Sequence, residues 1–309
     1  MLAIVAPGQG AQTPGFLTPW LTEQTFAERL DGLSGVVELD LRRYGTEADA
    51  DTIRDTAVAQ PLLVVAGLLA AEQLFRDGGF GPAGLAAGHS VGEITAAAGV
   101  GVLSAEDALV FVRERGRSMA AAAAIIPTSM TAVVGGKPDE VLAAIEAQGL
   151  TAANNNGSGQ IVAAGTTEQL AGLAENPPPR ARLIPLSVAG AFHTVHMGPA
   201  VDHLTRLTES MTTHDPQTTL VSNADGQVVP NGAEVLRRLV AQVASPVRWD
   251  LCMATMSELG VTGLLELPPA GTLTGIAKRN LKGVELFALN TPDQLPDARE
   301  FAASHGGVT

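Results

Sequence analysis

A serine between two glycines is the most informative feature of the sequence. Residues 88–92 read Gly-His-Ser-Val-Gly, with Ser90 at the centre. The segment Ala83–Ala87 is small and apolar enough for a buried strand, and Val91–Val100 has the spacing of a helix. A serine at such a strand-to-helix turn presents its hydroxyl outward, as in a nucleophile elbow. The main-chain N–H of Val91 could then face a developing oxyanion. The pattern favours a nucleophile over an ordinary turn.

Six histidines could supply the base that a serine nucleophile needs. His89 adjoins Ser90 in the sequence, so we expect its side chain to leave the turn in another direction. His193 lies where an inserted segment rejoins the main part of the chain, a common place for an active-site cleft. His196 lies one helical turn further on, but no third ligand cluster follows and Cys252 is remote. The sequence therefore predicts no metal site.

Three arginines lie on one predicted helix, and one of them stands apart. Arg113 and Arg117 share a face, whereas Arg115 shares an apolar stripe with Phe111 and Met119. An arginine on an apolar stripe needs an anion because an unpaired buried charge is costly. Two partners fit: an internal Asp or Glu, which the sequence alone favours, or a substrate carboxylate held bidentately.

The loop after the first predicted strand reads Pro-Gly-Gln-Gly-Ala-Gln over residues 7–12. Its glycines let the main chain approach a neighbour closely. The loop lacks the lysine and hydroxyl residue of a P-loop and the spacing of a dinucleotide fingerprint, so nucleotide binding is disfavoured. Gln9 could instead donate hydrogen bonds to an oxyanion near Ser90.

The composition is that of a globular protein, and its charge disfavours nucleic acid and anionic membranes as partners. Hydrophobic residues make up 46% of the 309, and the net charge is −13. The single cysteine, Cys252, excludes an internal disulfide and is expected to be a buried structural thiol. The chain opens with an apolar strand rather than a basic leader, and its longest apolar stretch, Pro61–Ala71, is short for a bilayer span. These features predict a cytoplasmic protein.

The elements that must position these residues alternate between strands and helices. Over residues 1–126 we predict a first strand, a helix over 61–76, the strand before Ser90 and a helix over 104–123. This alternation is typical of an α/β fold with a parallel sheet.

Residues 127–190 follow a different order: strand, helix, strand, strand, helix, strand. This is the order of a ferredoxin-like unit, and turn or breaker residues, Pro127 and Gly190, flank it. The strands are expected over 129–134, 151–156, 160–165 and 181–188, and the helices over 138–148 and 167–175. The simplest interpretation is a small subdomain inserted into a larger one.

After the insertion the α/β alternation resumes over residues 191–309. We predict helices over 196–213, 232–244 and 247–259, and strands over 218–224, 263–267 and 284–289. Past Pro292 the chain is expected to form a loose tail.

Together these residues resemble the malonyl-CoA:acyl carrier protein transacylases, the discrete acyltransferases of bacterial fatty acid and polyketide synthesis. The matching segments span the chain in order: residues 7–12, 88–93, Arg115, 190–193, and Gln242 followed by 246–249. The resemblance implies a hydrolase-like large subdomain, 1–126 and 191–309, with a ferredoxin-like small subdomain, 127–190. Only three of the 19 basic residues are lysine, which resembles the actinobacterial branch.

The resemblance also implies a role for each residue of the set. Ser90 would attack the malonyl thioester, and His193 would take its proton and later return it to the departing thiol. Gln9 and the Val91 N–H would hold the oxyanion. Arg115 would pair with the free malonyl carboxylate.

Further positions of the family match residues near this set. Gln242 would orient the histidine through its main-chain carbonyl, which accounts for the absence of an obvious third acid. Asn223 and His89 would be neighbours of the site. Phe192 and Val91 resemble the malonyl-selective members rather than the methylmalonyl-selective ones. The family implies no permanently bound cofactor: malonyl-CoA is the substrate and holo acyl carrier protein is the partner.

Carrier proteins are acidic, as this chain is, so docking requires a local basic patch. The candidates are Arg180 and Arg182, near a run of prolines, and Lys278 with Arg279. For each of them a solvated surface charge is the other interpretation.

Two other functions compete with the transacylase. A serine esterase or thioesterase would use the same elbow, but it would usually place an acid between the serine and the histidine. A non-catalytic module that binds carrier protein would not need Ser90, His193, Arg115 and Gln9 together. Arg115 and the inserted subdomain weigh against the first alternative, and the complete set argues against the second.

Overall fold

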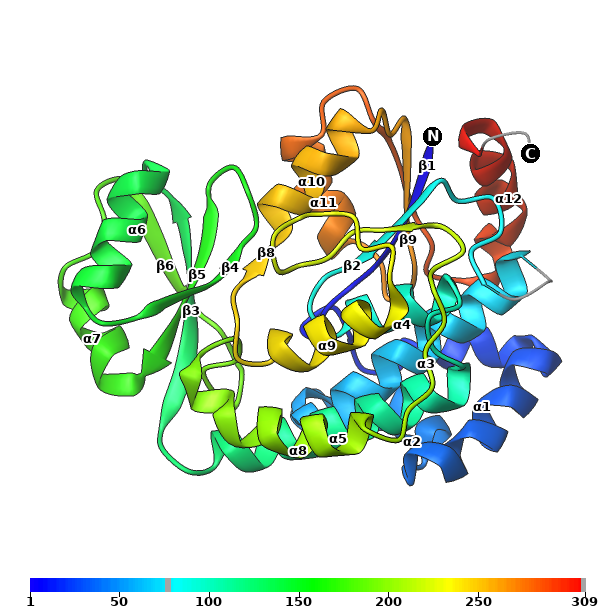
Figure 1. Cartoon of the computed structure of the whole chain (residues 1–309), viewed down its shortest axis with the longest axis horizontal. Coiled ribbons are helices and arrows are strands. Elements are labelled where there is room, and N and C mark those ends of the chain that lie inside the picture. Colours follow the sequence, from blue (N-terminus) through cyan, green and yellow to red (C-terminus); the bar gives the residue numbers. More distant parts are fainter. Residues whose placement is uncertain (76–78, 307–309) are drawn as a thin grey trace.

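The computed structural model describes residues 1–75 and 79–306. Within these residues the chain forms two five-stranded sheets, each covered by its own helices (Figure 1). The larger sheet is parallel, and the smaller one is antiparallel apart from one edge pair. This arrangement confirms the α/β class and the parallel sheet predicted for the main part of the chain.

The larger sheet has the strand order β10-β9-β1-β2-β7. Its strands are β1 (Leu2–Ala6), β2 (Leu85–Gly88), β7 (Thr219–Leu220), β9 (Gly263–Glu266) and β10 (Glu285–Ala288). β1 is buried on both faces because alternate residues enter separate cores, as Ile4 and Val5 illustrate. Ser90 follows β2, so it stands at the carboxyl edge of a central strand, where ligands of parallel sheets bind.

Helices cover both faces of this sheet (Figure 1). The first core contains side chains of α1 (Gln24–Val37), α2 (Leu41–Thr46), α3 (Thr56–Phe75), α4 (Gly92–Gly99), α5 (Ala105–Ala123), α8 (Gly198–Thr208), α9 (Gly232–Gln242) and α12 (Leu295–His305). The second core contains side chains of α10 (Trp249–Glu258) and α11 (Thr272–Asn280). Short 3₁₀ helices are η1 (Thr18–Thr22), η2 (Thr52–Arg54), η3 (Val195–Met197) and η4 (Pro292–Gln294). The helix predicted to carry Arg115 is confirmed as α5.

Helix α3 is longer than the sequence suggested. It begins at Thr56, and Asp55 Oδ1 accepts a hydrogen bond from the Ala57 N–H at 2.8 Å, so the helix starts before Pro61. The helix is long and apolar enough to cross a membrane, which the expected stretch of Pro61–Ala71 was not. However, 83% of its most apolar window is buried inside the fold. It is the central helix of the first core.

The smaller sheet has the order β6-β3-β5-β4-β8 and lies at one end of the molecule with α6 (Pro138–Ala147) and α7 (Thr167–Glu175) (Figure 1). Four strands come from the predicted insertion: β3 (Thr128–Gly135), β4 (Thr151–Asn155), β5 (Gln160–Thr166) and β6 (Ala181–Pro185). The fifth, β8 (Val247–Arg248), comes from the large subdomain and pairs in parallel with β4. The helix predicted to start at residue 247 therefore starts at Trp249, because the two residues before it join the sheet. The boundaries at 127 and 190 stay a prediction.

The prediction of a loose tail past Pro292 is wrong for the residues that the structure describes. Helix α12 buries Leu295, Ala298 and Ala302 against the first core. The Arg299 guanidinium also donates hydrogen bonds to two carbonyl oxygens at the end of α3, at 2.7 and 3.1 Å. The sequence reading also omitted α11. Both helices are short amphipathic segments that become stable only when they pack on the sheet.

The packing of α12 leads to a stability prediction. Leu295→Ala should lower the free energy of unfolding by about 2–3 kcal/mol, because truncation of a buried leucine leaves a cavity. Urea unfolding monitored by circular dichroism measures the change. Ala303→Gly, at an exposed position of the same helix, is the control and should cost about 1 kcal/mol or less. If Leu295→Ala lowers the free energy of unfolding by less than Ala303→Gly does, burial of Leu295 does not stabilise the fold.

Candidate active site

Ser90 occupies the turn between β2 and α4 in a strained backbone conformation. Its φ is 54°, in the left-handed region, as a nucleophile elbow requires. The turn closes only because its flanking residues lack side chains. A Cβ on Gly88 would collide with the main chain of Gly92. A Cβ on Gly92 would in turn collide with the carbonyl oxygens at the end of β1. The predicted elbow is thus present in the structure.

Asn223 holds this turn from the loop after β7. Its Oδ1 accepts a hydrogen bond from the Ser90 N–H at 2.8 Å, and its Nδ2 donates to the Gly88 carbonyl at 2.7 Å. The residue is completely buried. The predicted site neighbour therefore contacts the main chain of the nucleophile rather than its hydroxyl.

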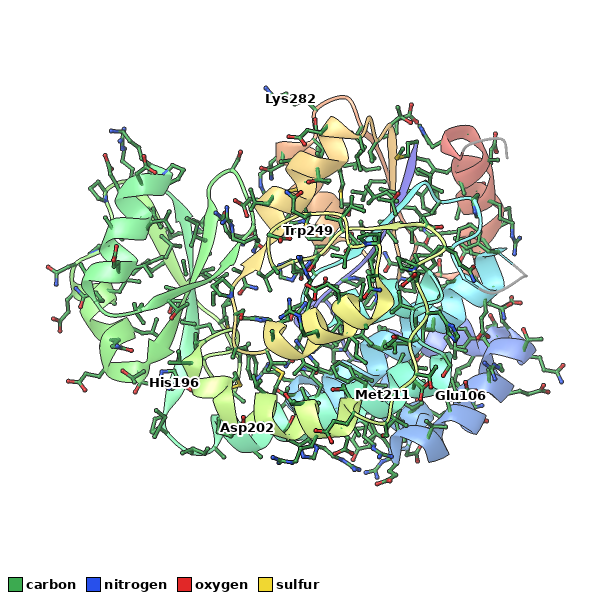
Figure 2. All side chains as sticks on the ribbon, viewed as in Figure 1. Glu106, His196, Asp202, Met211, Trp249 and Lys282 are labelled. Atoms are coloured by element: carbon green, nitrogen blue, oxygen red, sulfur yellow. The ribbon has the colours of Figure 1, made fainter. Side chains whose placement is uncertain are left out.

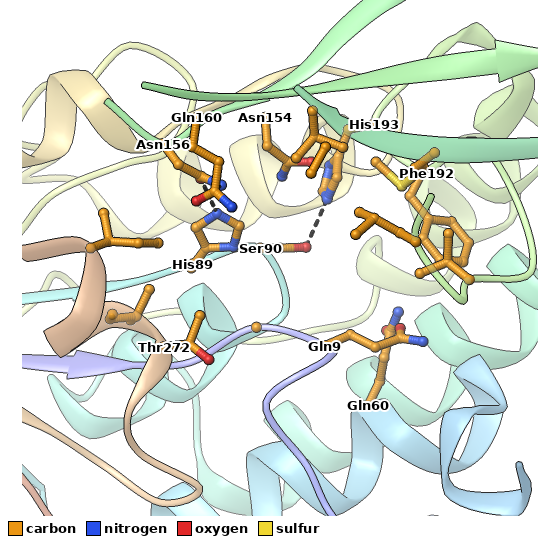
Figure 3. Close-up of a pocket in the computed structure, with 18 of the residues that line it drawn as sticks. Gln9, Gln60, His89, Ser90, Asn154, Asn156, Gln160, Phe192, His193 and Thr272 are labelled. Atoms are coloured by element: carbon orange, nitrogen blue, oxygen red, sulfur yellow. Dashed lines mark hydrogen bonds between the residues drawn. The ribbon is translucent and has the colours of Figure 1, made fainter. Parts of the chain in front are cut away.

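Ser90 and His193 meet as the sequence suggested. Ser90 Oγ lies 2.7 Å from His193 Nε2 (Figure 3), and His193 Nδ1 lies 2.7 Å from the main-chain oxygen of Gln242. A carbonyl oxygen can only accept, so Nδ1 carries the proton and Nε2 is free to accept the proton of the serine. The carbonyl of Gln242 thus takes the place of the acid in a Ser-His-Asp arrangement.

Burial keeps His193 in its basic form. Burial in the cleft and the nearby positive charge of Arg115 lower the pKa of His193 to about 3. At neutral pH the imidazole is therefore uncharged and ready to accept a proton.

The lowered pKa of His193 predicts an unusual pH profile. A depressed pKa means that the neutral base persists as the pH falls, so inactivation of Ser90 by an uncharged phosphonofluoridate should keep its rate constant from about pH 8 to about pH 5. Stopped-flow inactivation kinetics measure the rate. A half-maximal rate near pH 6.5, the ordinary value for histidine, would show that the imidazole is not desolvated as the structure has it.

Arg115 lies on the buried stripe of α5 predicted for it and is 1% exposed. The internal ion pair that the sequence favoured is not formed among the described residues. Its partners are neutral amides: Nη1 donates to Gln60 Oε1 at 2.7 Å, and Nη2 donates to Gln242 Oε1 at 2.9 Å. The guanidinium is therefore held in place by groups that do not neutralise it.

The same guanidinium lies at the nucleophile. Nη2 is 3.4 Å from Ser90 Oγ, and Nε is buried without a hydrogen-bond partner among the described residues. Burial lowers the pKa of Arg115 to about 9, although the negative charge of Glu93 opposes the shift. Arg115 thus remains a cation at neutral pH. Its chemistry is that of a receptor for an anionic group attached to whatever Ser90 attacks.

The candidate oxyanion donors are the side chain of Gln9 and the main-chain N–H groups of Gln9 and Val91, and they differ in their hydrogen bonds. The Gln9 side chain donates from Nε2 to the Arg54 carbonyl and to Thr56 Oγ1, at 3.2 and 3.3 Å, so its amide is engaged away from Ser90. The main-chain N–H groups of Gln9 and Val91 donate to no acceptor within residues 1–75 and 79–306. If Gln9 contributes, it does so through its main chain rather than its side chain.

A pocket between the two subdomains surrounds Ser90 (Figure 3). The cavity has a volume of about 180 Å³. One wall comes from the large subdomain, including Gln9 and Gln60, and the other from the small sheet, including Asn154 and Gln160. Phe192 lies within the lining and is almost fully buried. The pocket can hold a small acyl group beside the nucleophile. Arg115 does not line it, but its Nη2 lies 3.4 Å from Ser90 Oγ.

His89 leaves the turn in a direction of its own, as predicted. Its Nε2 lies 2.9 Å from Asn156 Oδ1 in the small subdomain (Figure 3), and its ring packs edge-on against Trp249. Burial lowers the pKa of His89, which keeps the ring neutral. His89 therefore connects the two walls of the pocket and does not contact Ser90 Oγ.

Other predicted residues lie away from the nucleophile. Lys278 and Arg279 are exposed in the last turn of α11, whose first turn lines the pocket, and Arg180 and Arg182 are exposed near the start of β6. His196 lies in η3 at the surface beside α8 (Figure 2), and no group of three or more metal-binding side chains occurs in the described part of the chain. The carrier-docking assignments stay predictions.

Sequence reasoning missed several residues of the site. Gln60 contacts Arg115, and Asn154, Asn156 and Gln160 form the opposite wall of the pocket. Glu93 belonged to the matching segment 88–93, but no role was predicted for it; it accepts from the Gln242 side chain. The signal that was present was a large polar side chain within an apolar run, as at Gln60 in α3 and Glu93 in α4. Such residues are rarely buried without a function or a specific partner.

Comparison with known proteins adds an independent line of evidence. The family model described as the acyl transferase domain matches residues 4–298. The malonyl CoA-acyl carrier protein transacylase of Mycobacterium tuberculosis is 49% identical over 298 residues, which cover 96% of this chain and 99% of that protein. The crystal structure of MCAT from Mycobacterium tuberculosis superimposes with a TM-score of 0.92 at 48% identity, covering 97% of this chain and 99% of that one.

A further solved structure shows a relative with its partner. It is a malonyl-transacylase in complex with its holo type II PKS acyl-carrier protein, and it matches 97% of this chain and 99% of its own at 30% identity and a TM-score of 0.89. These matches agree with the elbow, the Ser-His pair and the buried arginine described above. The chain belongs to the acyl transferase family, and within it to the malonyl CoA-acyl carrier protein transacylases.

Proposed function

We propose that this protein transfers a malonyl group from malonyl-CoA to the phosphopantetheine thiol of an acyl carrier protein. Ser90 Oγ attacks the thioester carbonyl carbon while its proton passes to His193 Nε2. The carbon–sulfur bond then breaks, and the proton returns from His193 to the CoA thiolate. The carrier thiol resolves the malonyl-Ser90 ester by the same steps in reverse, which gives ping-pong kinetics.

The observation that carries this proposal is a buried guanidinium beside the nucleophile that no carboxylate of the described residues contacts directly. With Nη2 only 3.4 Å from Ser90 Oγ, an acyl group on Ser90 places a terminal carboxylate within reach of Arg115. The unpartnered Nε offers a further donor to such a group. A hydrolase for neutral esters has no use for a buried cation at this position, because its desolvation is costly. The esterase and thioesterase alternatives therefore lack support.

The remaining groups complete the mechanism in this proposal. The main-chain N–H groups of Val91 and Gln9 hold the oxyanion of the tetrahedral intermediate, and one such donor is worth about 2.7–4 kcal/mol of transition-state stabilisation. Phe192 limits the space beside the acyl group and favours malonyl over its branched homologue by about 1–3 kcal/mol. No resident cofactor takes part. The partner is the holo carrier protein, which meets exposed cations such as Lys278 and Arg279, and the reaction takes place in the cytoplasm.

Intact-mass spectrometry tests this function directly. The protein is mixed briefly with malonyl-CoA, and a malonyl adduct on Ser90 is expected. Addition of a holo acyl carrier protein should move the adduct to the carrier. Release of free CoA with neither a persistent adduct nor a malonylated carrier would instead identify a hydrolase.

A further inference from the structure

We propose that Glu93 is a positioning residue that fixes the amide of Gln242 and so aims Arg115 at the carboxylate of the acyl group. The inference rests on the proposed function, since the anion that Arg115 receives is the malonyl carboxylate. Glu93 lies in the first turn of α4, directly beneath the nucleophile turn, and is 2% exposed. Nothing in the chemical steps above uses it.

The Gln242 side chain connects Glu93 to the catalytic groups. Its Nε2 donates to Glu93 Oε2, to the Ser90 carbonyl at 3.2 Å and to Asn223 Oδ1 at 3.3 Å. Its Oε1 accepts from Arg115 Nη2 at 2.9 Å. A guanidinium can only donate and an ionised carboxylate can only accept. Arg115 and these acceptors, of which Glu93 is the charged one and the nearest, therefore impose one orientation of the amide, with oxygen toward Arg115 and nitrogen toward Glu93.

The surroundings of Glu93 require an acceptor at both of its oxygens. The main-chain N–H of Asn223 donates to Oε1 at 3.2 Å, while Gln242 donates to Oε2. A glutamine at position 93 has only one acceptor oxygen. Because the main-chain N–H of Asn223 cannot turn, that oxygen must face it, and the new NH2 group then faces Gln242. The Gln242 NH2 then either meets this new NH2, donor against donor, or turns toward Arg115, again donor against donor. In both cases the amide that holds Arg115 is displaced.

The titratable groups near Glu93 come from three packed helices. Arg115 on α5 and Arg238 on α9 favour its ionised form, and the Cys252 thiol on α10 is itself kept protonated by burial. Burial raises the pKa of Glu93 to about 7, against the hydrogen bonds of Asn223, Ser222 and Gln242. A second cavity, of about 250 Å³, is lined by Glu93, Gln242 and Arg238 and shares no lining residue with the acyl pocket. Protons can therefore reach Glu93 from this cavity rather than through the acyl pocket.

The test compares two reagents that modify Ser90 in Glu93→Gln: malonyl-CoA, whose acyl group is charged, and an uncharged phosphonofluoridate. The second-order rate constant for malonylation of Ser90 by malonyl-CoA should fall by about 10- to 100-fold, because Arg115 loses its alignment. The rate constant for an uncharged phosphonofluoridate, which does not need Arg115, should change less than about threefold. Glu266→Gln is the matched control. It removes a second buried carboxylate, which ends β9 and accepts main-chain N–H groups from the start of α11, and it should leave the ratio of the two rates unchanged.

Two results would overturn the inference: a parallel loss of both rates, which would mean that Glu93 only supports the turn, or no loss of malonylation. If the variant does not fold, the wild-type protein supplies the test. A raised carboxyl pKa means that the ionised form is lost as the pH falls, so malonylation should decline as the pH falls through about 7 while phosphonofluoridate inactivation does not. Malonylation that stays constant across this range would contradict the proposal. A wild-type protein that takes no malonyl group at all would refute the proposed function instead, whatever the behaviour of Glu93.

Discussion

Arg115→Ala is expected to abolish most malonyl transfer while raising activity on acetyl-CoA relative to malonyl-CoA. The expected loss in kcat/KM for malonyl-CoA is roughly 30-fold to several-thousand-fold, which corresponds to about 2–5 kcal/mol for the loss of a buried charged partner. Acetyl-CoA should be affected little or should improve, because it has no carboxylate and no longer faces an unpaired buried cation. Steady-state kinetics with both thioesters measure the ratio.

Arg117→Ala is the matched control for this experiment. Arg117 lies on the same helix but is half-exposed and pairs with Glu38 and Glu114 at the surface. Its loss should change the free energy of unfolding by no more than about 1 kcal/mol and should leave both thioesters unaffected. Unchanged malonyl kinetics in Arg115→Ala would remove the carboxylate assignment, and with it the reason to prefer a malonyl group as substrate.

Ser90→Ala should eliminate acyl loading altogether. Removal of a nucleophile that forms the covalent intermediate lowers the rate by roughly 10³- to 10⁶-fold, and no adduct should be visible by intact mass after incubation with malonyl-CoA. The substitution should fold normally, because the hydrogen bond of Ser90 to Asn223 comes from its main chain. Ser210→Ala, at an exposed position after α8, should load as the wild type does. Covalent labelling that survives in Ser90→Ala would place the nucleophile at another residue.

The sequence predicted those parts of the fold that local patterns determine. The helix of Arg115 and the helices and strands of residues 128–185 are close to their expected positions, because each has strong periodicity and clear turn residues. Helix α12 and strand β8 were missed for a different reason. Each is short, and each is stabilised by partners distant in the sequence: α12 by the end of α3, and β8 by β4. Tertiary pairing of this kind leaves no local signal.

The residues of the site also fall into two groups: those that a local pattern predicted and those that only tertiary packing brings to the site. Ser90, His193 and Arg115 could be predicted because each is unusual where it stands: a serine at a glycine turn, a histidine at a junction and an arginine on an apolar stripe. The two amides that hold Arg115, Gln60 and Gln242, come from separate helices. From the sequence alone an Asp or Glu was the favoured partner for this arginine. Only the assembled packing shows that neutral groups hold it, which leaves its charge available.

The pairing of β8 with β4 has a consequence for how long substrates reach Ser90. The small subdomain is tied to the large one at three places around the pocket: by this strand pair, by His89 with Asn156, and by the Ser158 N–H with Asn280. Separation of the two halves would break all three contacts together. We therefore expect the pantetheine arm of either thioester to enter and leave while the two halves stay paired. Exchange of CoA for the carrier is then expected to involve side-chain movement rather than domain opening.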